Sequence, residues 1–358
     1  MTSITKPRVV HPGLAKNELG LTTRSYEGAM STLCAGCGHD SVTAALVEAL
    51  WSLSIEPHRV GKMSGIGCSS KTPGYFLEQS HGFNSVHGRM PAVATGANAA
   101  NRELTYIGVS GDGDSLSIGL GQMCHAIRRN LNLLYLIENN GVYGLTKGQF
   151  SASADIGTKS KRGVPNLQAP IDPVHLGLSI GATFVARGFS GDKTQLVPIL
   201  TAGIRHKGLA LVDIISPCVT FNDHQGSTKS YQHTRDHFRP ATEAALLDPP
   251  DMVEEMATIN VGPIPPGQFR DVSLHDGSVV RFRAMHEEYD PTDRGTAAAL
   301  VRRLQDRGEI PTGLLFVDPD AGDHHDVMNT VEEPLWSLPF EDLCPGSEVL
   351  SDMMARFR

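Results

Sequence analysis

One segment of the sequence, residues 104–140, restricts the folds open to this chain more than any other. Residues 104–109 and 131–137 are short apolar runs with the length and composition of buried strands. Between them, four apolar residues are spaced so that they share one face of a helix: Leu116, Leu120, Met123 and Ile127. The segment therefore predicts a β-α-β unit, in which a right-handed crossover joins two parallel strands.

Polar residues follow each of these strands. Gly111-Asp112-Gly113-Asp114 comes after the first strand and Glu138-Asn139-Asn140 after the second, so both clusters are expected at the carboxyl edge of the sheet. A magnesium ion on a diphosphate takes oxygen ligands, which the Asp112 carboxylate, the Asn140 amide and the Val142 carbonyl can supply. Either cluster alone is an ordinary turn signal. Because one helix joins them directly after two strands, together they predict a diphosphate and metal site.

The alternation of strands and helices continues towards the C-terminus. Residues 183–187 and 209–215 predict two more strands, with a helix at 194–206 between them and Cys218 just after the second. The pattern predicts an α/β fold with a mostly parallel sheet flanked by helices. Every polar cluster is then expected at the same edge of the sheet.

Two helices are predicted upstream. Apolar spacing over residues 42–50 indicates a helix behind Cys34-Ala35-Gly36-Cys37-Gly38, with Asp40 or Ser41 as its cap. A proline at the start of residues 91–100 favours a second helix there.

The composition of the sequence changes after about residue 235. Prolines and turn residues become frequent, a hairpin turn is predicted at residues 275–277, and a helix is predicted at residues 296–305. The sequence therefore predicts four parts: an N-terminal extension at 1–24, the main cofactor-binding domain at 25–235, a smaller appended region at 236–320 and a C-terminal tail at 321–358.

Composition excludes several classes of protein. The chain has 358 residues, of which 40% are hydrophobic and 20% charged, so it can bury a large core. No stretch approaches the roughly 20 apolar residues that cross a bilayer, and the first sixteen residues lack the apolar run of a signal peptide. A formal charge of −8 without a basic stripe argues against binding to nucleic acid. A cytoplasmic protein that binds neither membrane nor nucleic acid is expected.

The cysteines are too scattered for a disulfide scaffold: Cys34, Cys37, Cys68, Cys124, Cys218 and Cys344. Cys34 and Cys37 alone would suit a zinc site, a redox pair or half of a cluster site, with zinc favoured. Cys68 and Cys218 shift the balance, because four thiolates from three loops at the diphosphate edge favour an iron–sulfur cluster beside a cofactor. Cys124, inside a helix, is expected to be structural, and Cys344 receives no role.

The motifs resemble the beta subunits of 2-oxoacid:ferredoxin oxidoreductases, most closely the 2-oxoglutarate type. Strong likeness covers residues 25–235. The matching segments are Leu33-Cys34-Ala35-Gly36-Cys37-Gly38-His39, Gly65-Ile66-Gly67-Cys68, His87-Gly88-Arg89, Ala92-Val93-Ala94-Thr95-Gly96, Gly111-Asp112-Gly113-Asp114 and Asn139-Asn140-Gly141-Val142-Tyr143-Gly144.

The resemblance implies three cofactor sites. A [4Fe-4S] cluster would bind Cys34, Cys37, Cys68 and Cys218, and Mg²⁺ would bind Asp112, Asn140 and the Val142 carbonyl. Thiamine diphosphate would be surrounded by Ile66, Gly67, Cys68, Ser69, His87, Gly113, Asp114, Gly144 and Leu145. His87 and Lys71 match catalytic positions. A lone histidine is more often structural, and a lysine near Pro73 is more often on a surface turn.

The resemblance also implies an activity. The enzyme would decarboxylate a 2-oxoacid oxidatively, 2-oxoglutarate to succinyl-CoA and CO₂ in the best match, with coenzyme A as acyl acceptor and ferredoxin as electron acceptor. An alpha subunit would supply the glutamate at the aminopyrimidine ring, within a dimer of alpha–beta pairs. Lys71 would face the distal carboxylate of the substrate. The beta chain alone would then be inactive.

Other functions stay open at this stage. A pyruvate-type oxidoreductase would share all the motifs, and a non-redox thiamine diphosphate decarboxylase or synthase would share the diphosphate motif without needing four thiolates. A zinc-stabilised binding protein is the alternative outside enzymes. The basic loop at residues 158–163 is either a solvated surface loop or a contact for coenzyme A phosphates or an acidic ferredoxin.

Overall fold

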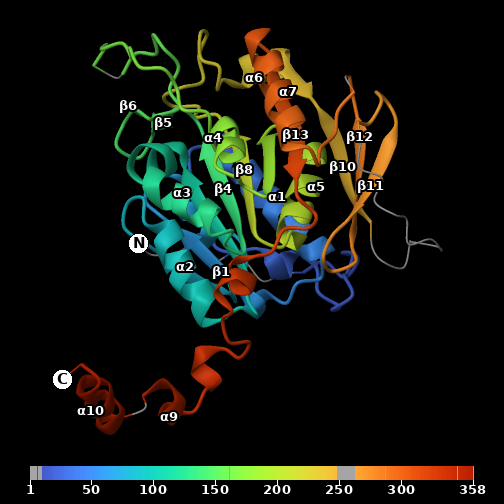
Figure 1. Cartoon of the computed structure of the whole chain (residues 1–358). Helices are drawn as coiled ribbons and strands as arrows, with labels where there is room; N and C mark the ends of the chain where they lie inside the picture. Colours follow the sequence, from blue (N-terminus) through green and yellow to red (C-terminus); the bar gives the residue numbers. More distant parts are fainter. Residues whose placement is uncertain are drawn as a thin grey trace.

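The structure is a computed structural model that describes residues 6, 10–160, 162–247, 263–286, 288–344 and 346–357. Its main layer is an eight-stranded sheet in the order β2-β1-β3-β4-β8-β7-β13-β9 (Figure 1). Among the described strands of this sheet, only β13 and β7 pair antiparallel, so the predicted α/β class with a mostly parallel sheet is confirmed. The strands are β1 (Val60–Ser64), β2 (His81–Asn84), β3 (Thr105–Gly111), β4 (Leu133–Asn139), β7 (Phe184–Phe189), β8 (Leu209–Ile215), β9 (Phe238–Pro240) and β13 (Ile310–Val317).

The central strands are apolar along their whole length because both faces of the sheet are covered. In β4, Leu134 and Leu136 enter one core, and Leu133, Tyr135 and Ile137 enter the other. The first core is covered by α1 (Gly38–Ser52) and α5 (Lys193–Arg205). The second is covered by α2 (Met90–Ala100), α3 (Leu120–Arg128), α4 (Pro173–Ser179) and α7 (Arg294–Asp306).

The predicted β-α-β unit is present, with two differences in detail. Both strands extend two residues further than predicted, since Gly111 still pairs with Glu138 and Asn139 with Ile215. The predicted single helix is instead a π-helical turn (Gly113–Ile118) followed by α3. The Gly119 N–H donates to the Asp114 carbonyl at 2.8 Å, and this wider turn separates the two helical pieces.

The cap predicted for α1 is wrong. The helix begins at Gly38, with Cys37 rather than Asp40 or Ser41 in the N-cap position. Tertiary contact explains the earlier start, because a Cβ at Gly38 would lie 2.5 Å from Ser216 Oγ. Only glycine lets the helix start so close to the loop after β8.

The C-terminal third belongs partly to the main sheet. β9 and β13 form its last two strands, so the sheet continues past the predicted boundary at residue 235. A smaller antiparallel sheet, β10-β12-β11, is made by β10 (Thr242–Leu247), β11 (Phe269–Ser273) and β12 (Val279–Ala284). The turn at residues 275–277 joins β11 to β12, as predicted. The division of the chain into four parts as a whole stays a prediction.

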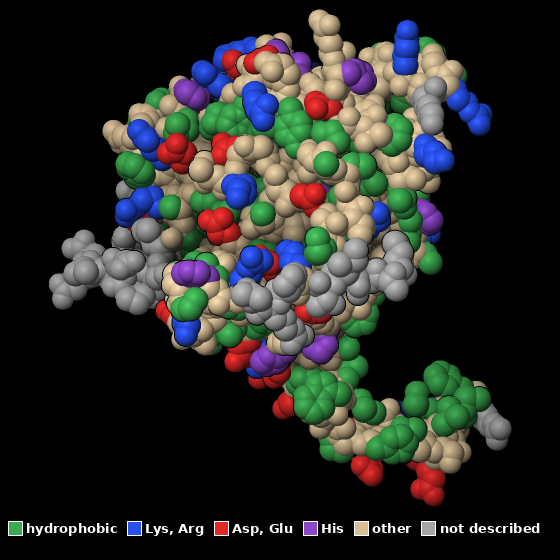
Figure 2. All heavy atoms as spheres, turned by 180° about the vertical axis from the view of Figure 1, so that it is seen from behind, with side chains coloured by type: hydrophobic (Ala, Val, Ile, Leu, Met, Phe, Trp, Pro, Cys, Tyr) green, Lys and Arg blue, Asp and Glu red, His purple; other side chains and the backbone are tan. Residues whose placement is uncertain are grey.

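The tail forms an arm beyond α8 (His324–Met328). Residues 335–357 contain a 3₁₀ turn (Leu335–Ser337), α9 (Phe340–Leu343) and α10 (Ser347–Ala355), and they lie away from the body in Figure 1. Large apolar side chains of the arm face solvent, including Trp336 at 81% and Phe357 at 86% exposure. Figure 2 shows apolar side chains gathered on the arm. Within the described residues, no helix is both long and apolar enough to cross a bilayer.

Shorter elements fill the loops. They are the 3₁₀ turns Thr23–Tyr26, Pro57–Arg59 and Ser69–Gly74, α6 (Tyr231–His237), and the two-stranded ribbon of β5 (Val142–Tyr143) and β6 (Gln149–Phe150). The loop after β4, which carries β5 and β6, lies at the end of the body opposite to the arm (Figure 1).

Candidate active site

Loops that follow β1, β2, β3 and β4 surround a cavity at the carboxyl edge of the sheet. Its wall includes every residue predicted to bind thiamine diphosphate or magnesium: Ile66, Gly67, Cys68, Ser69, His87, Asp112, Gly113, Asp114, Asn140, Val142, Gly144 and Leu145. The fold thus brings together residues that are up to 79 positions apart, from 66 to 145. Their individual roles stay predictions.

Asp112 lies at the end of β3 and is only 1% exposed. Its Oδ2 atom accepts hydrogen bonds from the Ser151 hydroxyl, from the Ser153 hydroxyl at 2.6 Å and from the Gly141 N–H at 3.0 Å. Its Oδ1 atom accepts one long bond, from the Asn140 N–H at 3.4 Å. Burial raises the pKa of this carboxyl, and the two serine hydroxyls lower it. Because Oδ1 accepts only this one long bond among those described, it keeps electron pairs that could bind a cation. A cation there would offset the cost of burying the charge.

Asp114 joins three segments of the site. Its Oδ1 atom accepts from the Gly88 N–H at 2.8 Å and the Ile66 N–H at 3.3 Å, and its Oδ2 atom accepts from the Ser110 hydroxyl at 2.8 Å. A side chain at Gly65 would collide with this carboxylate. Asp114 thus holds parts of the cavity wall together, and its predicted contact with the cofactor stays a prediction.

The loop after β4 is folded onto itself. Asn140 Oδ1 accepts from the Val142 N–H at 3.0 Å, and the Asn140 carbonyl accepts from the Asn222 side-chain amide at 2.8 Å. Gly141, between them, has a φ of +74° that favours glycine. The turn directs residues 140–142 towards Asp112, as a shared metal site would need.

The four predicted cluster cysteines come from loops at the same edge. Cys34 is exposed, Cys37 is buried, and Cys68 and Cys218 are intermediate, and all four thiols are free of disulfides. Burial raises the pKa of the Cys37 thiol to about 12, and a backbone hydrogen bond from His39 lowers it. Iron binding would have to displace this proton.

Direct contacts join the cysteine loops. The Gly38 N–H donates to the Pro217 carbonyl at 3.2 Å, and the Thr220 hydroxyl donates to Cys34 Sγ at 3.4 Å. A Cβ placed at Gly144 would lie 3.3 Å from Cys68 Sγ and 3.7 Å from Cys218 Sγ. A side chain at Gly144 would therefore crowd the space beside these two sulfurs.

A single-ion site is not formed by the described side chains, because no three His, Cys, Asp or Glu residues among them lie close enough to hold one metal ion. The two predicted metal sites differ from that arrangement. Asp112 would share its ion with an amide and a carbonyl oxygen, and the four thiolates of a cubane cluster each bind a separate iron. The donor sets fit both groups.

A buried carboxyl in the cavity wall was missed by the sequence reasoning. Glu138 is fully buried, and the Thr72 hydroxyl lies 3.0 Å from each of its carboxylate oxygens. His39 Nδ1 lies 3.6 Å from Glu138 Oε2 and 2.6 Å from Ser216 Oγ. Burial raises the pKa of Glu138 well above its usual range and lowers the pKa of His39 to about 4, so both neutral forms are favoured. Its place directly before Asn139-Asn140 was the available signal.

The two predicted catalytic residues differ in their position relative to the cavity. His87 is exposed on the cavity wall. Lys71 is half-buried in the 3₁₀ turn Ser69–Gly74 and is not among the residues that line the cavity. Its charge still reaches the site: burial raises the pKa of the Cys68 thiol, as does Cys218, and Lys71 lowers it.

A second lysine holds this turn in place. Lys62 in β1 is only 6% exposed, and its ammonium donates to the carbonyls of Pro73, Phe76 and Leu77 at 2.7, 2.6 and 2.8 Å. Burial lowers its pKa to about 8. These three bonds anchor the segment that carries Cys68 and Lys71 to the sheet.

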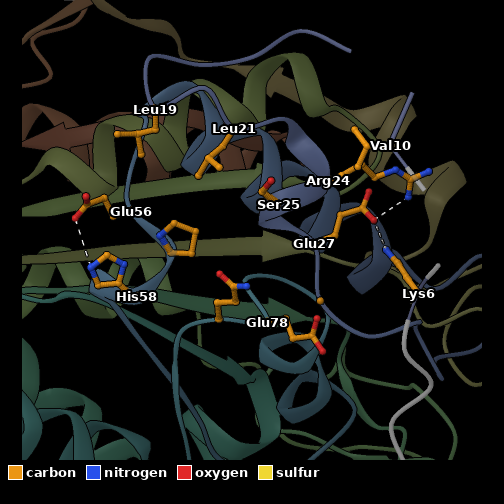
Figure 3. A pocket seen from close by; sticks show the side chains of 13 residues that line it. Lys6, Val10, Leu19, Leu21, Arg24, Ser25, Glu27, Glu56, His58 and Glu78 are labelled. Carbon is orange, nitrogen blue, oxygen red and sulfur yellow. Dashed lines mark hydrogen bonds and ion pairs between the residues drawn. The ribbon is translucent and has the colours of Figure 1, made fainter. Parts of the chain in front are cut away.

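A larger cavity, of about 650 Å³, lies elsewhere, near residues that precede β1 (Figure 3). It contains none of the predicted site residues. Two of its cations already pair with Glu27, Lys6 at 3.1 Å and Arg24 at 2.9 Å, while Glu56 pairs with His58 at 3.6 Å (Figure 3). Size alone therefore does not mark the active site.

The chain is similar to several known proteins. Residues 61–214 match the family described as thiamine pyrophosphate enzyme, C-terminal TPP binding domain. A 2-oxoacid:ferredoxin oxidoreductase subunit beta from Saccharolobus solfataricus is 40% identical over 228 residues, which are 63% of this chain and 74% of the relative. The 2-oxoglutarate oxidoreductase subunit KorB of Mycobacterium tuberculosis is 44% identical over 191 residues, 53% of this chain and 51% of that protein. The matched part thus spans between half and three quarters of these relatives.

One solved structure is also similar over most of the chain. It is a 2-oxoglutarate:ferredoxin oxidoreductase from Magnetococcus marinus with 2-oxoglutarate, coenzyme A and succinyl-CoA bound. The TM-score is 0.69 at 28% identity, and the alignment covers 89% of this chain and 92% of that one. The similarity therefore extends well beyond the segment that the family model matches.

Proposed function

This chain belongs to the beta subunits of the 2-oxoacid:ferredoxin oxidoreductases, and we propose that it binds the thiamine diphosphate and the [4Fe-4S] cluster of such an enzyme. The proposed reaction converts a 2-oxoacid and coenzyme A to an acyl-CoA and CO₂, with the electrons passing to ferredoxin. An alpha subunit completes the site and supplies the glutamate at the aminopyrimidine ring, in a dimer of alpha–beta pairs.

The observation that carries this proposal is the position of Gly144. It lines the diphosphate cavity, and its Cα faces Cys68 Sγ and Cys218 Sγ closely enough that a Cβ would lie within 3.7 Å of both sulfurs. The cofactor site and the cysteine site are therefore neighbours across one residue. An enzyme that moves electrons one at a time from substrate to cluster needs this closeness.

The residues have separate tasks in the proposed site. Thiamine diphosphate, when bound, supplies the nucleophilic carbon for the loss of CO₂. Asp112, Asn140 and the Val142 carbonyl hold Mg²⁺, and the glycines on either side of Asp112 allow the diphosphate to approach the backbone. Asp114 keeps the loops after β1 and β3 together through its bonds to Ile66 and Ser110.

The proposed substrate is 2-oxoglutarate. Its second carboxylate needs a cation, and Lys71 lies on the segment anchored by Lys62 beside Cys68. The names of the M. tuberculosis relative and of the M. marinus structure both refer to 2-oxoglutarate. Pyruvate has a methyl group at the corresponding position and gains nothing from such a cation.

The test is an anaerobic assay of the chain co-expressed with its alpha subunit. We expect ferredoxin reduction that requires both 2-oxoglutarate and coenzyme A, and none with the beta chain alone. Decarboxylation without ferredoxin reduction would support a non-redox decarboxylase or synthase, and preference for pyruvate would support the pyruvate type. Bound zinc with no thiamine diphosphate would overturn the proposal in favour of a zinc-stabilised binding protein.

A further inference from the structure

The proposed site has a diphosphate half around Asp112 and a cysteine half around the four predicted cluster ligands. A short turn after β8, residues 218–222, contacts both halves. The N–H groups of Phe221 and Asn222 donate to the Cys218 carbonyl at 3.2 and 2.9 Å, which closes the turn on itself. Cys218 begins the turn as a predicted cluster ligand. The side chains of Thr220 and Asn222 then extend to different partners.

Asn222 contacts the proposed metal-binding loop. It is 1% exposed, and its Nδ2 atom donates to the Asn140 carbonyl at 2.8 Å. A Cβ at Gly141 would lie only 2.7 Å from the same Nδ2 atom, so Gly141 allows the amide to sit directly against this peptide. The bond therefore fixes the peptide that joins Asn140 to Gly141. This peptide lies between the Asn140 amide and the Val142 carbonyl, the two oxygens that are proposed to hold Mg²⁺ with Asp112.

The other end of the Asn222 side chain is also buried. Among the residues that the structure describes, no hydrogen-bond partner is found for Asn222 Oδ1. An isolated buried acceptor is costly, so this amide is not explained by internal packing. A water bound to the proposed Mg²⁺ would be a donor of the required kind.

Thr220 contacts the cysteine half. Its hydroxyl donates to Cys34 Sγ at 3.4 Å. Hydrogen bonds to ligand sulfurs stabilise the more negative, reduced state of an iron–sulfur cluster and so raise its potential. Thr220 makes no hydrogen bond to the metal-binding loop among those described for it, and Asn222 lies two residues after the threonine that contacts the sulfur.

We propose that the 218–222 turn serves both cofactors through separate side chains: Asn222 positions the magnesium loop, and Thr220 sets the potential of the cluster through Cys34. This inference rests on the proposed function, because it assigns roles towards that enzyme's cofactors. It adds two positioning residues that do not themselves bind either group.

The test uses three variants of the alpha–beta complex, purified anaerobically: Asn222→Leu, Asn222→Asp and Thr220→Val. Thiamine diphosphate affinity is measured by calorimetry over a range of Mg²⁺ concentrations, iron content by chemical analysis and cluster potential by titration with electron paramagnetic resonance. Asn222→Leu should weaken thiamine diphosphate binding about five- to hundredfold, as expected for loss of a buried hydrogen bond. The Mg²⁺ concentration at half-saturation should rise, with iron content unchanged.

Thr220→Val is the matched control, because it changes the same turn by one hydroxyl. It should leave cofactor affinity unchanged and lower the cluster potential. Asn222→Asp keeps the shape of the side chain, replaces the donor with an acceptor and decides the question if Asn222→Leu does not fold.

Different failures have different meanings. If the unaltered complex binds neither thiamine diphosphate nor iron, the proposed function is wrong. If it binds both, and the Asn222 variants keep the original cofactor affinity and Mg²⁺ dependence, the positioning role of Asn222 is wrong. An unchanged potential in Thr220→Val would likewise remove the role of Thr220.

Discussion

The two halves of the site are built in different ways. In the diphosphate half, Asp112 is 1% exposed and its carboxylate is held by two serine hydroxyls and two backbone N–H groups. In the cysteine half, Cys34 is exposed, and the side-chain hydrogen bond found for its sulfur comes from the Thr220 hydroxyl. The polypeptide therefore holds Asp112 firmly by itself, whereas fewer direct contacts hold the cysteine half, and the proposed cluster would add further links between its loops.

The largest effect is expected from a substitution in the diphosphate half. Asp112→Ala removes the only carboxylate assigned to Mg²⁺ and leaves Ser151, Ser153 and two N–H groups without their acceptor. We expect thiamine diphosphate binding to be abolished while the iron content is retained. Calorimetry and iron analysis on the alpha–beta complex measure both. Unchanged cofactor affinity would show that the metal site has been misplaced.

The reciprocal experiment removes one thiolate. Cys218→Ser should lose or degrade the cluster and leave thiamine diphosphate bound, because the Asp112 network belongs to other loops. Iron content and the electron paramagnetic signal report the cluster, and cofactor extraction reports thiamine diphosphate. Cys124→Ser is the control, since Cys124 lies within α3 and should not alter the iron content. Full iron content with an unchanged signal in Cys218→Ser would exclude Cys218 from the ligand set.

An intermediate effect is expected at Lys71, in the turn that follows Cys68. Lys71→Ala should lower kcat/KM for 2-oxoglutarate about ten- to a hundredfold, because a charge-assisted hydrogen bond typically contributes about 1.5–3 kcal/mol. Turnover of pyruvate and 2-oxobutyrate should change far less. Lys147, which is exposed and on the loop after β4, provides a matched alanine control. Equal losses on all three substrates would assign Lys71 a general supporting role and leave the substrate assignment to family likeness.

The smallest effect is expected outside both halves, in the basic loop. Lys159 lines a cavity of about 290 Å³ together with Gly141, Val142 and residues 220–222. Lys159→Glu should raise the apparent KM for coenzyme A or for ferredoxin a few-fold, and high salt should reduce the difference. Lys161, the second lysine of this loop, lies outside the described residues, and the charge reversal can be repeated there. No change in either KM would identify the loop as a solvated surface.

The sequence predicts the parts of this fold that local patterns determine. Apolar periodicity identified the β-α-β unit, and the polar residues after its strands located the carboxyl edge of the sheet. Each of these patterns is formed by residues that are close together in the sequence. Tertiary contacts decided the rest. α1 begins at Gly38 because only a glycine fits beside Ser216 at this position. The arm beyond residue 334 has no counterpart in the predicted elements.

The same distinction applies to the site. Asp112, Asn140 and the cysteines belong to short motifs and could be predicted. Ser151, Ser153 and Asn222 carry no motif of their own, and they reach the site only because the loops after β4 and β8 return to it. Glu138 had a signal, its place at the end of a strand, but its burial beside Thr72 depends on the folded chain.

The most direct test of the two-part site is the cofactor content of the alpha–beta complex purified without oxygen. Iron, acid-labile sulfide, zinc and thiamine diphosphate are measured per beta chain, together with the absorption spectrum. We predict about four iron atoms and about four sulfides with one thiamine diphosphate, and no stoichiometric zinc. Stoichiometric zinc in place of iron, or thiamine diphosphate without iron and sulfide, would contradict the two-part site.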